Sequence, residues 1–226
     1  NIRIHFRDIR LNSHYLLQIV NGGAPSLSRN GLTSIAGIIL NHTAGTIGGD
    51  AAIAGMSVVN RVMLFANSAL IGFGQGFQPV CGFNFGARKF DRVKRAFKFG
   101  ITVTSLYCAL LSVVGYFFAE RIIALFRPDD FELIALASKA LRYECFVYTT
   151  VGFVTMSNMF LQNTRKTIRA TTLSASRQGF MLALALYFGR KFFGLTGIIA
   201  AQPVADGLTF LLAVPFAWSG LREMRE

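Results

Sequence analysis

The stretch FGITVTSLYCALLSVVGYFF, residues 99–118, contains no charged side chain. A helix needs about 20 apolar residues to cross the hydrocarbon core of a bilayer, so this stretch is long enough to span one. The whole chain agrees with that interpretation, because 53% of it is hydrophobic and only 15% is charged, whereas soluble domains average about 25% charged residues. We therefore expect an all-α, polytopic membrane protein.

Six apolar segments divide the chain, at about residues 31–47, 51–72, 99–118, 143–162, 171–189 and 197–218. A GGDA turn separates the first two segments, and the second stays apolar as far as Phe85. Because that is much more than one span needs, we expect Gly72, Gly74, Gly76 and Pro79 to break or bend its helix. The pattern predicts six transmembrane helices within residues 31–218 and a cytoplasmic tail at 219–226. Residues 1–30 are interpreted as a cytoplasmic lead-in, with an interfacial amphipathic helix and a plain linker both left open.

Basic residues gather on alternate sides of these segments. The clusters lie before the first segment (Arg3, Arg7, Arg10, Arg29), between the second and third (Arg88, Lys89, Arg92, Lys94, Arg95, Lys98), between the fourth and fifth (Arg165, Lys166, Arg169) and after the sixth (Arg222, Arg225). The intervening loops carry few or balanced charges, with Arg190 and Lys191 as the exception. Positively charged loops stay in the cytoplasm, so we expect both termini there, in a membrane of the bacterial inner type.

The formal net charge of +12 therefore indicates topology and not nucleic-acid binding. No GxxxxGK[ST] phosphate loop occurs, and three scattered cysteines with three histidines form no metal-binding or catalytic spacing. We expect a protein that is not an enzyme, with no cofactor and no bound metal.

Four stretches, in the expected order, resemble the multidrug and toxic compound extrusion (MATE) transporters. The most specific is GFGQGFQPVCGFNFGARKFDRVKRAF, similar to the run that follows the eighth helix of that family. The other three are GAPSLSRNGLTSIAGIILN for helix seven, TIRATTLSASRQ before helix eleven, and FGLTGIIAAQPVADGLTFLLA for helix twelve. The resemblance covers nearly the whole chain.

That resemblance implies the C-terminal six-helix lobe of a secondary antiporter. Such a transporter would export drugs or other organic cations in exchange for Na⁺ or H⁺ by alternating access, with an N-terminal six-helix lobe as the partner of this one. A half-size protein that dimerises is an alternative. Two other functions also stay open, a lipid or oligosaccharide flippase of related architecture and a membrane scaffold that transports nothing.

Asp206 is the leading candidate for a functional residue, because an acidic side chain at membrane depth is costly to keep there. The other interpretation places it near the outer mouth or in an ion pair, for example with Arg61. Arg61 must itself face protein or water, and we favour a structural ion pair for it. Glu144 is interpreted as an interfacial anchor at the outer end of the fourth segment. Some MATE transporters carry acidic residues in helices seven and ten, and aligning this chain with them places Thr33 or Ser34 and Val151 or Gly152 at those positions. The resemblance therefore implies that this lobe lacks those acids.

Several uncharged or weakly titrating residues complete the candidates for an ion or substrate pathway. His42 would titrate near physiological pH, although a lone helical histidine is more often only hydrogen-bonded. The others would line a cavity or bond neighbouring helices, and the second role is the safer one for any single residue: Asn41, Gln75, Gln78, Asn84 and Asn158.

Overall fold

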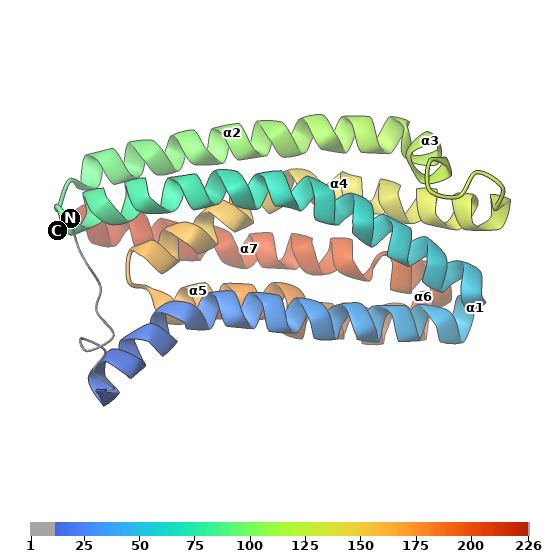
Figure 1. Ribbon diagram of the computed structural model, residues 1–226, viewed down its shortest axis with the longest axis horizontal. Helices are drawn as coiled ribbons and strands as arrows, with labels where there is room; N and C mark the ends of the chain where they lie inside the picture. The colour runs from blue at the N-terminus through green and yellow to red at the C-terminus, as the bar shows by residue number, and fades with distance from the viewer. Residues whose placement is uncertain (1–11, 226) are drawn as a thin grey trace, which may run out of the picture.

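The computed structural model describes residues 12–225 and is built of helices in that range. Its elements are α1 (Ser13–Gly86), α2 (Phe90–Phe117), α3 (Ala119–Ala124), α4 (Phe131–Asn163), α5 (Thr167–Ala175), η2 (Ser176–Phe180), α6 (Met181–Ile199), α7 (Ala201–Arg222) and η3 (Glu223–Arg225). The long helices lie side by side along one axis (Figure 1). The expected all-α membrane fold is confirmed.

Helix α1 is two helices joined at Gly49, which has φ 65° and ψ −160°. This backbone region is open to glycine and costly for other residues, so the GGDA stretch reverses the chain where the sequence predicted a turn. With α1 counted as two, six long helical segments cross the described part of the molecule. Four of them are long and apolar enough to span a membrane: Gly48–Gly86, Phe90–Phe117, Thr167–Ile199 and Ala201–Arg222.

The sequence predicted a break or a bend between Gly72 and Pro79, and the break is wrong. The only residue in α1 with non-helical backbone angles is Gly49, and the helix continues to Gly86. Gly74 is buried against Met159 of α4, so here a glycine serves close packing. Lipid offers no substitute for a lost backbone hydrogen bond, which favours keeping the helix intact at such positions.

The fifth predicted segment is also longer than expected. It runs from Thr167 through the wide turn η2 to Ile199, and it reverses near Gly194, where φ is 57°. Arg190 and Lys191 therefore lie within α6 and not in a loop as the sequence suggested. The lead-in is helical from Ser13, while residues 1–11 and 226 lie outside the described part.

The connections alternate between the two ends of the bundle (Figure 1). The α1–α2 turn, the α4–α5 turn and the end of α7 share one end, which carries the basic clusters that begin at Arg88 and Arg165 together with Arg222. We call it the basic end. The Gly49 reversal, α3 and the α6–α7 turn lie at the other end. The folded chain thus collects on one side the charges that are spread along the sequence.

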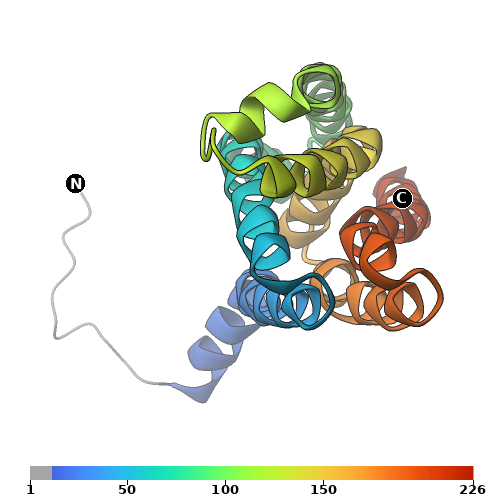
Figure 2. The same cartoon turned by 90° about the vertical axis from the view of Figure 1, so that its right-hand side faces the viewer.

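Helix α4 lies between the neighbouring helices α1, α2 and α7 and packs against each of them (Figure 2). Gly152 allows the backbones of α4 and α2 to approach closely, because a Cβ there would meet the carbonyl carbon of Thr104 at 2.9 Å. Toward the basic end the core is aromatic, with the rings of Phe97 and Phe160 stacked 4.4 Å apart. Many large apolar side chains elsewhere are exposed, as expected of a surface that meets lipid.

Candidate functional site

A polar cavity of about 330 Å³ opens between α1, α4, η2 and α7. It differs from the other pockets of the described chain in containing charges of both signs at the depth of the spans. Its polar lining comprises Thr33, Asn60, Arg61, Asn67, Glu144, Arg177, Gln178, Gln202 and Asp206. Charged groups within a membrane bundle mark a functional-site candidate, so this cavity is the site we consider.

Arg177 and Asp206 form a bidentate ion pair in this cavity. The Nε atom of Arg177 lies 2.8 Å from Oδ1 of Asp206, and its Nη2 lies 2.9 Å from Oδ2. Gln202, one turn before Asp206 on α7, donates from Nε2 to the same Oδ1 at 3.0 Å. The side chain of Asp206 is only 3% exposed, so these donors replace the water it would otherwise need.

The wide turn η2 supplies Arg177 to this pair. Residues Ser176–Phe180 form a π-helical turn between the regular helices α5 and α6. Such turns insert an extra residue and occur often at functional sites. The ion pair that the sequence left open for Asp206 is present, but its basic partner is Arg177 and not Arg61, the example given there. Arg61 lines the same cavity, is exposed and forms no ion pair with any described residue.

Glu144 reaches the cavity from the middle of α4. Its interpretation as an interfacial anchor is therefore wrong, because α4 begins at Phe131 and not near Tyr143 as the sequence suggested. The hydrogen bonds and ion pairs of the described residues do not include its carboxylate. Glu144 is thus the one acidic residue lining this cavity that is not committed to a defined partner.

The other predicted pathway residues lie outside this cavity. Asn158 is buried and donates from Nδ2 to the carbonyl of Ala170 at 2.7 Å and to Oγ of Ser174 at 2.9 Å, which ties α4 to α5. Asn84 donates within its own helix, from Nδ2 to the carbonyl of Val80 at 2.8 Å.

The remaining four differ in exposure. Gln75 and His42 are exposed, and Gln78 is half-buried. Asn41 has a buried Oδ1 with no hydrogen-bond partner among the described residues. Whether any of them contacts a transported ion or molecule stays a prediction.

Among the cavity residues, Arg177 and Gln202 were not candidates from the sequence, and Glu144 had been assigned another role. A signal for the ion pair was present, because Arg177 and Asp206 are opposite charges inside consecutive apolar segments. Two such charges in adjacent spans stabilise each other best when they face each other. Glu144 carried no comparable signal, since its helix starts 12 residues before the apolar run, at Phe131 and not at Tyr143.

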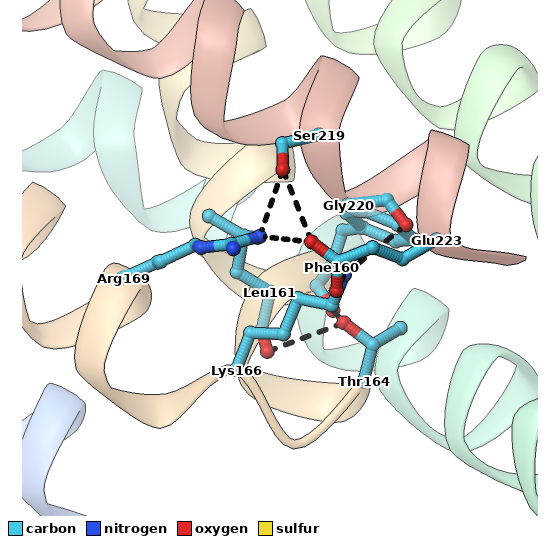
Figure 3. A network of polar contacts seen from close by, with 8 residues as sticks. All are labelled: Phe160, Leu161, Thr164, Lys166, Arg169, Ser219, Gly220 and Glu223. Atoms are coloured by element: carbon cyan, nitrogen blue, oxygen red, sulfur yellow. Dashed lines mark hydrogen bonds and ion pairs between the residues drawn. The ribbon is translucent and has the colours of Figure 1, made fainter.

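A second polar cluster lies at the basic end (Figure 3). Glu223 accepts from Nζ of Lys166 at 2.6 Å, from Nη1 of Arg169 at 2.8 Å and from Oγ of Ser219 at 3.1 Å. Hydrogen bonds from Lys166 and then Arg169 lower the pKa of Glu223 to about 2. This cluster fastens the end of α7 to the α4–α5 turn.

Metal ligands do not gather in the part of the chain that the structure describes. Cys81, Cys108 and Cys145 are buried and unpaired. Residues 12–225 contain no group of three or more His, Cys, Asp or Glu side chains that could hold a metal ion.

Comparison with known proteins places these features in a family. The MatE family model matches residues 25–187. The multidrug export protein MepA of Staphylococcus saprophyticus is 26% identical over 207 residues, which is 91% of this chain and 45% of that protein. MepA of Staphylococcus haemolyticus is 26% identical over 202 residues, 89% of this chain and 44% of that protein.

Solved structures show the same fold. A crystal structure of MATE in complex with MaL6 superposes with a TM-score of 0.89 at 19% identity, covering 99% of this chain and 51% of that one. A MOP superfamily transporter from Pyrococcus furiosus gives the same TM-score and identity, covering 100% of this chain and 51% of that one. The chain thus spans about half the length of the relatives it matches. With the family model matching most of its length, the chain belongs to the MatE (multidrug and toxic compound extrusion) family.

Proposed function

We propose that this chain is one lobe of a drug exporter. In that proposal it is the C-terminal lobe, its partner is a second six-helix lobe, and the pair exchanges organic cations for Na⁺ or H⁺ by alternating access. Support comes from the family, from relatives named as multidrug export proteins, and from their length, of which this chain spans about half.

The proposal rests on a difference in ion pairing between the two carboxylates in the cavity. Asp206 is neutralised by Arg177, whereas Glu144 has no ion pair. A carboxylate without a fixed counter-ion within a membrane bundle favours a cationic guest. We propose that Glu144 receives either the organic cation or the coupling ion, and that the Arg177–Asp206 pair holds α7 against η2 beside it.

A flippase for anionic lipid-linked molecules is the second candidate. Arg61 favours it, because this residue lines the cavity as a cation with no ion pair among the described residues. One exposed arginine opposes one unpaired glutamate, so charge alone does not separate the two functions, and transport assays are needed.

Proteoliposomes that contain the full-length transporter distinguish them. A drug exporter will move a cationic dye such as ethidium against its gradient when an inward Na⁺ or H⁺ gradient is imposed, and an ionophore that dissipates the gradient will stop it. Scrambling of lipid-linked oligosaccharide without dye transport would instead establish the flippase. Export by this chain expressed alone would show that two copies suffice, and failure of both assays would leave the scaffold function.

A further inference from the structure

A second membrane-level feature lies away from the polar cavity. Helices α2 and α7 both pack on α4, and a groove of about 760 Å³ opens between them at the basic end. Phe153 of α4 contributes to the wall of this groove. None of the residues that line it belongs to the cavity around Glu144.

The groove is divided into a charged part and an apolar part. Lys94 and Lys98, one turn apart near the start of α2, lie at the same end as Arg222, the last residue of α7. A hydrogen bond from Nζ of Lys94 to the carbonyl of Met224, at 3.5 Å, confirms that these two helix ends meet. Deeper in the membrane the lining becomes apolar, with Ile101 and Val214 among its residues.

The positive charges at the mouth of the groove are not neutralised within the described residues. Lys94, Lys98 and Arg222 take part in none of the ion pairs found there. Glu223, which follows Arg222, is engaged instead by Lys166 and Arg169. A ligand that has an anionic head group and an apolar tail would therefore match these three cations and the apolar groove below them.

We propose that this groove binds an anionic phospholipid, with its phosphate at Lys94, Lys98 and Arg222 and an acyl chain along Ile101, Val214 and Trp218. Basic pockets between transmembrane helices favour anionic lipid head groups. Trp218 is exposed beside the charged part, at the level where tryptophan marks the membrane interface. A free phosphate would contact only the charged part of the groove. The apolar walls therefore favour a lipid, whose acyl chain would cover them.

Trp218 is also a built-in reporter, because it is the only tryptophan of the chain. Brominated acyl chains quench tryptophan on contact, so vesicles of phosphatidylcholine can carry an equal mole fraction of brominated phosphatidylglycerol or of brominated phosphatidylcholine. The full chain is reconstituted into each, and quenching gives the relative affinity of the two lipids. Each basic residue near the membrane surface favours an anionic lipid by roughly fivefold, so three such residues should together give a preference of at least about tenfold for phosphatidylglycerol.

A pair of double variants separates the groove from the general surface charge. Lys98→Gln/Arg222→Gln removes two of the three basic residues and should lower the preference by about fivefold or more, whereas Arg92→Gln/Arg95→Gln should change it by less than about twofold. Arg92 and Arg95 are exposed on the same helix, near the same end, and do not line the groove. Circular dichroism establishes that each variant is folded. Quenching of wild-type Trp218 by the two brominated lipids tests the proposal without any variant.

Three outcomes would overturn the proposal. Equal quenching of wild-type Trp218 by both brominated lipids would show no selection of the head group. An equal loss in both double variants would assign the preference to surface potential. Weak quenching by either lipid, together with cross-linking between copies of the Val214→Cys variant, would show that protein covers the groove. Because no result depends on export, failure here is distinct from failure of the transport function.

Discussion

Arg177 and Asp206 lie 29 positions apart in the sequence, yet their side chains meet through two parallel hydrogen bonds of 2.8 and 2.9 Å. The contact joins η2 to α7 and neutralises two charges that the membrane would otherwise make costly. Side-chain exposures of 20% and 3% make it a shielded pair, beside which Glu144 remains unpaired.

Replacing one partner of this pair should destabilise the fold. Asp206→Asn leaves the Arg177 guanidinium without its counter-ion, and we expect the free energy of unfolding to fall by roughly 3 kcal/mol. Thermal unfolding in detergent measures the effect. Arg177→Met/Asp206→Leu should recover most of it, since apolar replacements of a shielded pair are often neutral. Ion-coupled export that survives in the double variant would exclude the pair from transport.

Glu144→Gln should weaken binding of a cationic dye by about tenfold, equivalent to about 1.4 kcal/mol, because the amide removes the unpaired charge from the cavity. Thermal stability should change little, since the carboxylate has no hydrogen bond or ion pair among the described residues to lose. Fluorescence titration of the full-length transporter gives the dissociation constant. Glu132→Gln, an exposed site on the same helix, is the matched control and should bind as the wild type does. Equal affinities in all three proteins would remove Glu144 from recognition.

Gly49→Ala should lower stability by about 1–3 kcal/mol, because its φ of 65° and ψ of −160° are accessible essentially to glycine alone. Gly72→Ala is the informative comparison. Gly72 is helical with open space around its Cβ position, so alanine there should raise stability by about 0.5–1 kcal/mol. Chemical unfolding of both variants measures whether each substitution raises or lowers the free energy of unfolding. A stabilising Gly49→Ala would mean that the chain reverses elsewhere.

Glu223→Gln should loosen the basic end in a way that depends on pH. The folded pKa of Glu223, about 2, lies below its ordinary value of 4.5, so the carboxylate stabilises the folded chain above pH 4.5 and loses that contribution as the pH falls toward 2. Because the side chain is half exposed, solvent screening limits the effect to under about 1 kcal/mol. Melting temperatures at neutral pH should differ between wild type and variant and converge near pH 2.

Glu120→Gln provides the control for that experiment, since Glu120 pairs with Arg142 away from the basic end. Protease sensitivity of the α4–α5 turn should rise in Glu223→Gln and stay unchanged in Glu120→Gln. A difference between wild type and Glu223→Gln that persists at pH 2 would contradict the assigned pKa.

Much of the fold was predictable because the thickness of the bilayer sets the length and the spacing of the apolar runs in the sequence. Runs such as residues 99–118 have to be helices, and the basic clusters that follow every second run have to collect at one end. The Gly49 reversal was predictable for a local reason, since two glycines and an aspartate interrupt an apolar pattern. Gly74 misled for a related reason, because it packs closely against Met159, and within a membrane helix glycine often serves packing and not a turn.

By itself, the sequence determined the membrane class, the basic end and the expectation that Asp206 is costly where it lies, because each depends only on residue type and spacing along the chain. Only the tertiary structure decided that Arg177, and not Arg61, neutralises Asp206, and that Glu144 points into the same cavity. The π turn at η2 and the early start of α4 at Phe131 set the rotation of those helices. Which polar side chains meet depends on that rotation, and it is fixed by packing between helices and not by hydropathy.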